Sequence, residues 1–290
     1  MTADPTDSTA EKAPPPELVT LAVIAYRQES VVRAAIEGAF AQTYPNLEII
    51  LSDDASPDGT FAVMQDMAAA YDGPHKIVLN RNTPNLGLIG HVNRIFDMAR
   101  GCLIVANAGD DISLPERCTE LYHAFRQTRP LLVDSELIPM AQDGQVLRRS
   151  VSRRDVLDGL DQIDKLATSM RSVVGASCGW NPDLHRIFGP ITEAAAYEDQ
   201  VIYFRARLAG RVAHVPKPLV KYRQGGMSRG DGGPAWKLKK TEVALATMRQ
   251  RLADLATFEA RARGLISAEE TSLTAMRDRL TRRIARGQAE

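Results

Sequence analysis

Two pairs of adjacent aspartates, each placed directly after a short apolar run, constrain this chain more than any other feature. Residues 47–52 lead into Asp53-Asp54, and residues 103–106 lead through a small-residue turn into Asp110-Asp111. A short apolar run that ends in such a turn is typical of a buried parallel strand. Because open α/β sheets bind ligands just beyond the carboxyl ends of their strands, the two pairs predict a ligand site at that edge.

The acidic pairs carry a chemical requirement as well as a position. Adjacent carboxylates repel each other unless a positive or hydrogen-bonding group lies between them. A hard divalent cation, or the polar groups of a nucleotide, meets that requirement. The alternative is that the aspartates only shape turns or cap helices, beside Asp58-Gly59 and before Pro115. One pair alone would favour this alternative, whereas two pairs after two buried strands favour a ligand site.

Strand and helix patterns alternate through the first half of the chain. Apolar runs predict strands at residues 18–25, 47–52, 76–80 and 103–106, with a helix after each. This alternation predicts an α/β fold in which helices sandwich a mostly parallel sheet through right-handed crossovers. The second half is less regular: we expect strands at 131–140, 212–215 and 219–222 and a helix from Glu198.

Composition limits the function classes. The 290 residues carry a formal net charge of zero, which gives no electrostatic case for a nucleic-acid partner. Three widely spaced cysteines without metal-site spacing fit a reducing compartment, so we expect a cytoplasmic protein. No apolar stretch approaches the ~20 residues of a membrane helix. Residues 1–17 are polar and rich in proline, which predicts a disordered lead.

The tail, residues 235–290, differs from the proposed main domain at residues 18–234. Its two apolar stripes predict two amphipathic helices, and it carries twelve Lys and Arg against seven Asp and Glu. We expect these helices to dock on the main domain, with or without forming a homodimer. The other expectation is peripheral contact with the inner face of a membrane, through the basic residues Arg277, Arg279, Arg282, Arg283 and Arg286.

Several segments together resemble the family 2 glycosyltransferases with the A-type fold. Residues 19–28, 41–50 and 53–60 carry the most specific part of this resemblance. Further matches follow in the family's order, at residues 85–87, Gly109-Asp110-Asp111 with Pro115, Glu198-Asp199 and residues 215–223. The resemblance covers about residues 18–230 and implies transfer of a sugar from a nucleotide donor to a hydroxyl group of a glycan or lipid-linked acceptor, usually with inversion.

The resemblance also implies roles for individual residues. Asp110 and Asp111 match a motif for a divalent metal, Mn²⁺ or Mg²⁺, and Asp199 matches the catalytic base, with Glu198 as its neighbour. A UDP-, dTDP- or GDP-linked donor would bind at Ala25, Tyr26, Arg27, Glu29, Asp53, Asp54, Asn85, Gly87, Asp110 and Arg223. A glycine-rich loop follows Arg223, and we expect it to close over the diphosphate of the donor.

The sequence departs from the family pattern at three places, one of them Gln224, where a His often follows the closing Tyr-Arg, and two alternatives stay open. The first strand ends in Ala25-Tyr26-Arg27-Gln28 instead of a Pro-x-Tyr-Asn sequence, and Ala108 replaces an aspartate of the metal motif. The loss of that carboxylate keeps a catalytically silent sugar-nucleotide-binding module in view. A nucleotidyltransferase is the other alternative, although its usual glycine-rich basic loop does not follow the first strand.

Overall fold

The computed structural model describes residues 15–147, 163–225, 233–262 and 270–287. Strands β1 (Val19–Ala25), β2 (Leu47–Asp53), β3 (Lys76–Arg81) and β4 (Ile104–Ala108) alternate with helices α1 (Val32–Phe40), α2 (Thr60–Ala69) and α3 (Gly87–Met98). The predicted alternation of the first half is therefore confirmed, with boundaries within two residues for the strands.

The second half contains shorter elements and the two tail helices. In chain order they are β5 (Ile112–Ser113), α4 (Arg117–Thr128), β6 (Leu132–Met140), α6 (Ile163–Thr168), β7 (Cys178–Trp180), α7 (Asp183–Phe188), α8 (Glu198–Ala209), β8 (Val212–Arg223), α9 (Pro234–Ala262) and α10 (Glu270–Gly287). A 3₁₀ turn at Gly175–Ser177 precedes β7.

All of these strands belong to one sheet, in the order β3-β2-β1-β4-β7-β6-β8-β5. Strands β1 to β4 pair in parallel, and so do β6 and β8. The short strands β7 and β5 run antiparallel to their neighbours. The predicted mostly parallel sheet is confirmed, and the antiparallel strands are additions that the sequence patterns did not predict.

The prediction of two strands at residues 212–215 and 219–222 was wrong, because β8 is continuous from Val212 to Arg223. Its register against β6 shifts near Ser135 and Glu136, opposite the segment that holds Pro216 and Pro218. Proline has no backbone N–H for the ladder, so an irregularity of this kind lets the strand continue.

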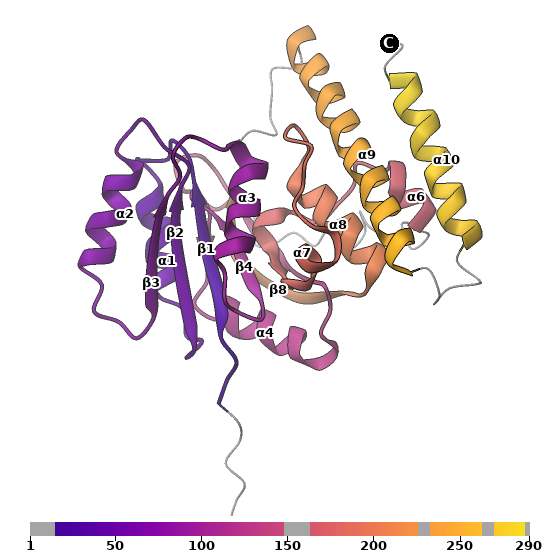
Figure 1. Cartoon of the computed structure of the whole chain (residues 1–290). Coiled ribbons are helices and arrows are strands. Elements are labelled where there is room, and N and C mark those ends of the chain that lie inside the picture. The colour runs from indigo at the N-terminus through magenta and orange to yellow at the C-terminus, as the bar shows by residue number, and fades with distance from the viewer. Residues whose placement is uncertain (1–14, 148–162, 226–232, 263–269, 288–290) are drawn as a thin grey trace, which may run out of the picture.

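Helices cover both faces of the sheet (Figure 1). Side chains alternate between the faces of a strand: Leu21 and Val23 of β1 pack with α1 and α4, whereas Ala22 packs in the cluster that includes α3 and α8. The ends of β1, β2 and β4 therefore emerge between two helical layers.

The tail helices dock on the rest of the chain. Helix α9 contacts α8 and α7, while α10 contacts α9 and α6, and Figure 1 shows both at the side of the molecule opposite β3. Leu255 of α9 and Met276 and Leu280 of α10 are buried in the core that also holds α8. None of the helices in the described ranges combines the length and the apolar composition that crossing a membrane requires.

Most of the predicted disordered lead, residues 1–14, lies outside the described residues. Its last residues are held: Glu17 forms an ion pair with Arg129, and Tyr44 donates a hydrogen bond to the backbone carbonyl of Glu17.

Candidate active site

A cleft of about 480 Å³ opens where the ends of β1 and β4 face the start of α8. It brings together most of the predicted site residues: Ala25, Tyr26, Asp54, Asn85, Gly87, Asp110, Asp111, Glu198, Asp199 and Arg223. Three others, Arg27, Glu29 and Asp53, are not part of its lining. The cleft has two sides, which we name after the ligands that the resemblance to glycosyltransferases implies for them: the donor side (the ends of β1, β2 and β4) and the acceptor side (the 3₁₀ turn and the start of α8).

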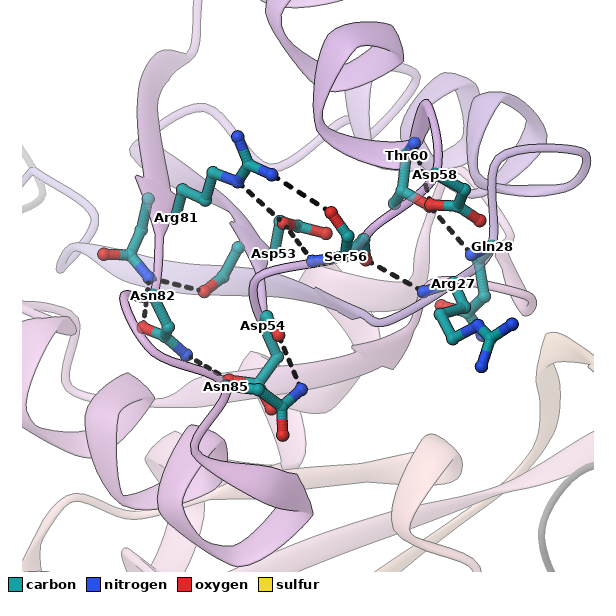
Figure 2. A network of polar contacts seen from close by, with 12 residues as sticks. Arg27, Gln28, Asp53, Asp54, Ser56, Asp58, Thr60, Arg81, Asn82 and Asn85 are labelled. Atoms are coloured by element: carbon teal, nitrogen blue, oxygen red, sulfur yellow. Dashed lines mark hydrogen bonds and ion pairs between the residues drawn. The ribbon is translucent and has the colours of Figure 1, made fainter.

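The two aspartates after β2 have different surroundings, as Figure 2 shows. Asp53 is fully buried, accepts a 2.9 Å hydrogen bond from the backbone N–H of Ser56, and lies 3.5 Å from Arg81 Nε. Asp54 accepts 2.8 Å bonds on Oδ1 from Asn82 and from the backbone N–H of Leu86, and it lines the cleft. Asp53 therefore stabilises the turn, whereas Asp54 faces the cleft.

The turns after β1 and β2 are tied to each other (Figure 2). The backbone N–H of Arg27 donates to Ser56 Oγ at 2.9 Å, and that of Gln28 donates to Thr60 Oγ1 at 2.8 Å. Glu29 accepts a 3.0 Å bond from the backbone N–H of Gly59. Both Arg27 and Glu29 have exposed side chains, so in this structure their contacts shape the rim of the donor side.

The second acidic pair lies against the end of β8. Asp111 is buried and accepts a 2.7 Å bond on Oδ1 from the backbone N–H of Arg223. The Arg223 side chain donates to the carbonyl of Asp110 at 3.1 Å and to the carbonyl of Ala141 at 3.2 Å. Burial, together with the neighbouring Asp110, holds the pKa of Asp111 well above its usual range, and burial also raises the pKa of Asp110. These buried carboxylates would gain from a cation in the cleft.

On the acceptor side, Glu198 and Asp199 begin helix α8 and line the cleft. The N-terminus of a helix favours negative charge. Glu198 faces the 3₁₀ turn so closely that a Cβ atom on Gly175 would lie 2.9 Å from its Oε1. Burial, and after it the charge of Asp199, raises the pKa of Glu198 to about 8. The raised pKa therefore favours a proton on the Glu198-Asp199 pair at neutral pH.

Comparison with known proteins identifies the family of this chain. The sequence model described as glycosyl transferase family 2 matches residues 20–169, which are 150 of the 290 residues. The chain is a family 2 glycosyltransferase. It is 37% identical over 92 residues to the Bacillus subtilis protein EpsE, covering 32% of each chain. It is 27% identical over 214 residues to EpsH of the same organism, covering 71% of this chain and 60% of EpsH.

An Escherichia coli relative carries a specific name. It is UDP-Glc:alpha-D-GlcNAc-diphosphoundecaprenol beta-1,3-glucosyltransferase WfaP, 30% identical over 112 residues that cover 39% of this chain and 42% of WfaP. The matched regions thus span between 32% and 60% of the length of these three relatives.

Solved structures share the fold of this glycosyltransferase. Staphylococcus aureus TarS 1–349 in complex with UDP-GlcNAc superposes with a TM-score of 0.58 and 13% identity, over 93% of this chain and 83% of TarS. The mannosyltransferase PcManGT from Pyrobaculum calidifontis, in complex with GDP-Man and Mn²⁺, gives a TM-score of 0.59 and 15% identity, over 93% and 84% of the two chains. At these identities the likeness shows the A-type fold.

Two functional candidates on the donor side escaped the sequence patterns. Gln28 lines the cleft and hydrogen-bonds to the Asp110 carboxylate, while its own Oε1 is buried without a partner among the described residues. Arg117 is fully buried and donates to the carbonyls of Ala106 (2.7 Å) and Ala176 (2.5 Å), which ties β4 to the 3₁₀ turn. A lone glutamine or arginine gives no sequence signal of this kind.

The acceptor side of the glycosyltransferase is held by buried residues of α9. Arg251 is fully buried and donates to the carbonyls of Leu166, Ala167 and Ser169 at 3.1, 3.0 and 2.6 Å, and to that of Gln200 in α8 at 3.1 Å. Among the acidic groups near it, Asp199 has the largest effect on its pKa, although burial lowers that pKa to about 10. A positive charge is therefore held beneath the start of α8.

Further α9 residues hold the segment that precedes α8. Gln250 Oε1 accepts from the backbone N–H groups of Thr192 and Glu193 at 2.8 and 3.1 Å, and Thr247 accepts from that of Tyr197 at 3.2 Å. The tail thus supports the segment that leads into α8 without itself lining the cleft.

Proposed function

We propose that this family 2 glycosyltransferase moves one sugar from a UDP-, dTDP- or GDP-linked donor to a hydroxyl group of a glycan or lipid-linked acceptor, with inversion. The observation that carries the proposal is the single cleft in which Asp54 and Asp110 lie on the donor side and Glu198-Asp199 on the acceptor side. The neighbours bound to UDP-GlcNAc and GDP-Man support a nucleotide-sugar donor, and the name of WfaP supports a lipid-diphosphate acceptor.

The donor nucleoside would lie against the ends of β1 and β2. Asp54 can accept hydrogen bonds from an N–H of the base or from ribose hydroxyls, because its carboxylate lines the cleft. Asn85 holds the backbone of Asp54 in place by donating a 2.6 Å hydrogen bond to its carbonyl oxygen. Gly87 has a positive φ of 71° and no side chain, so the backbone can approach the nucleotide closely there.

The acidic pair on β4 fits a divalent cation that the donor's phosphates help to hold. Among the described residues there is no group of three or more Asp, Glu, His or Cys side chains that would hold a metal alone. Mg²⁺ commonly binds through one or two carboxylates together with substrate phosphates and water. Asp110 would be the ligand and Asp111 its support, because Oδ1 of Asp111 already accepts from Arg223. When bound, Mn²⁺ or Mg²⁺ neutralises the charge of the leaving diphosphate.

The acceptor hydroxyl would attack the anomeric carbon from the side of α8. A bond forms between the acceptor oxygen and this carbon while the bond from the carbon to the donor phosphate oxygen breaks, so a single displacement inverts the centre. The hydroxyl proton passes to the Asp199 carboxylate, and the electron pair of the broken bond leaves with the diphosphate. Glu198 keeps a proton up to about pH 8, so it can donate a hydrogen bond while Asp199 accepts the proton.

Arg223 provides a cation close to the proposed phosphate position. Its guanidinium is anchored to carbonyls of Asp110 and Ala141, and the residue lines the cleft. The glycine-rich loop that follows lies, for residues 226–232, outside the described residues, and closure over the diphosphate stays a prediction.

For the whole protein we propose a cytoplasmic location, peripheral at the inner face of the membrane, where a lipid-linked acceptor would be met. The free thiols of Cys102, Cys118 and Cys178 are consistent with a reducing compartment. Family membership argues against the nucleotidyltransferase alternative. The silent module remains the second candidate, because Ala108 removes one carboxylate from the metal motif.

The test is a panel of UDP-, dTDP- and GDP-sugars, with donor hydrolysis and transfer measured with Mn²⁺, with Mg²⁺ and with a chelator. We expect one nucleotide class to be consumed only with metal. Calorimetry of Asp110→Ala should show metal-dependent donor binding weakened about tenfold or more. Metal-dependent binding without any turnover on the panel would identify the silent module, and unchanged titrations of Asp110→Ala would remove Asp110 from the site.

A further inference from the structure

A second concave site lies between the tail helices, far along the chain from the acidic pairs. A groove of about 500 Å³ runs between the beginning of α9 and the end of α10. We call it the basic groove and define it by four cationic and three apolar residues: Lys237, Lys240, Arg283, Arg286, Ala244, Leu245 and Met248. Figure 1 shows these two helices side by side at the edge of the molecule.

The charge of the basic groove is one-sided. Its lining includes no Asp or Glu. Elsewhere on α10, Arg277 pairs with Glu259 at 3.5 Å and Arg282 with Asp278 at 4.0 Å, so these two charges are partly neutralised within the protein. Within the described part of the chain, the four groove cations form no such ion pair. An anion is the ligand that this arrangement favours.

The apolar part of the groove indicates which kind of anion would bind there. Its floor holds Ala244, Leu245 and Met248, and Leu238, one turn before Thr241 on the same helix, is 63% exposed. Two residues earlier, and therefore on another face of α9, the ring of the half-buried Trp236 has its centre 4.8 Å from Lys240 Nζ. An exposed leucine next to lysines is typical of a helix that lies in a membrane interface. A small soluble anion would leave the apolar residues in water.

A second copy of this chain is a poorer occupant. A symmetric dimer brings the same patch of both subunits together. Here that would place eight cations in one interface, and like charges at an interface cost several kcal/mol. Charge complementarity therefore favours a bilayer of anionic lipids.

We propose that the basic groove binds the phosphate head groups of anionic phospholipids, with the exposed Leu238 entering the acyl boundary. Binding of this kind would hold the glycosyltransferase at a membrane surface, which is where the lipid-linked acceptor of the proposed function would be met. The lipid binding itself does not depend on the transfer reaction, so the two proposals can fail separately.

The test is flotation of the full chain with vesicles of phosphatidylglycerol and phosphatidylcholine (30:70), compared with pure phosphatidylcholine. The groove variant carries Lys237→Ala, Lys240→Ala, Arg283→Ala and Arg286→Ala. The matched control loses four exposed cations elsewhere, through Lys76→Ala, Arg100→Ala, Arg126→Ala and Arg249→Ala. Each cation near an anionic surface contributes about fivefold to binding, so we expect the groove variant, which loses four of them, to bind roughly 600-fold more weakly and the control only a few-fold.

A further variant, Leu238→Ser, keeps the charge and should weaken binding several-fold through loss of the apolar contact. All variants should keep the thermal transition of the parent and its donor hydrolysis, because none of the changed residues lines the catalytic cleft. Equal losses in the groove and control variants, or a parent that stays unbound to the anionic vesicles, would overturn the proposal. A concentration-dependent dimer that only the groove variant abolishes, seen by light scattering, would reassign the groove to self-association.

Discussion

The donor and acceptor sides of the cleft are built in opposite ways. On the donor side, the polar groups stand at strand ends and are held by neighbouring turns, as when Asp53 bonds to Ser56 three residues later. On the acceptor side, Glu198 and Asp199 rest on a helix whose first turn is held by Arg251, about fifty residues further along the chain. A bond within one turn positions Asp53 at the donor side, whereas packing of a distant helix positions the acceptor-side carboxylates.

Two ion pairs test this difference between the donor side and the acceptor side most directly. Arg205 and Asp254 form a buried two-bond pair at 2.8 Å that joins α8 to α9, whereas the Arg81–Asp53 pair is 3.5 Å long and Arg81 is 46% exposed. Arg205→Met leaves a buried charge without its partner and should lower the free energy of unfolding by about 3–5 kcal/mol. Arg81→Met should cost less, about 1–2 kcal/mol, because this ion pair is longer, Arg81 is half exposed, and the buried Asp53 keeps its hydrogen bond from the Ser56 backbone.

Chemical denaturation measures the free energy of unfolding of Arg205→Met and of Arg81→Met, and the exposed Arg249→Met serves as the control. Equal losses for Arg205→Met and Arg81→Met would show that the acceptor side does not depend on α9 more than the donor side depends on its own turns.

The next effect separates chemistry from binding. Asp199→Asn keeps the shape of the side chain but cannot take a proton at neutral pH, so turnover should fall by roughly 100-fold or more while the donor dissociation constant is unchanged. Single-turnover kinetics and calorimetry measure the two quantities. Glu242→Gln, an exposed change on α9, should alter neither. Near-normal turnover of Asp199→Asn would contradict the base assignment.

The donor side should show the reverse pattern. Asp54→Asn removes the charge of the carboxylate that lines the cleft but keeps its size, and we expect donor binding about tenfold weaker. Turnover at saturating donor should change much less. Asp66→Asn, an exposed change in α2, is the control. A fall in turnover without a change in the dissociation constant would place Asp54 with the chemistry instead.

The last effect concerns pH. Glu198 has a pKa of about 8 in the folded chain against an ordinary value of 4.5. Between these values the folded state holds a proton that the unfolded state has lost, so this contribution to stability is complete below about pH 4.5 and declines as the pH rises towards 8. Glu198→Gln lacks that dependence and should gain in melting temperature relative to the parent between pH 5 and pH 9. The same difference at both pH values would refute the raised pKa.

The sequence predicted the donor side better than the acceptor side for a physical reason. Strand periodicity and turn residues are local, and they located Asp54 and Asp110 at the ends of β2 and β4. The same pattern treated Asp53 as equivalent to Asp54. Side chains alternate along a strand, however, so the Asp53 carboxylate points inward and is buried, whereas Asp54 lines the cleft.

Long-range packing left no comparable pattern. Arg251 reads as one more charged residue on an amphipathic helix, and only the fold shows that it is fully buried beneath α8. The two-residue strand β5 is too short to carry a period. Continuity of β8 through Pro216 and Pro218 depends on a register shift in its partner strand, which no property of residues 212–223 reveals.

The hydrogen bonds from Gln250 and Arg251 to the segment around α8 have a consequence for the timing of synthesis. Chains fold domain by domain as they emerge from the ribosome at about 5–20 residues per second. The strands of the donor side can assemble early, but the acceptor carboxylates wait for α9, about fifty residues and several seconds later. Under the proposed function, a nascent chain would hold a nucleotide before it could use one, and a ribosome that stalls between α8 and α9 would release a binder without a catalyst.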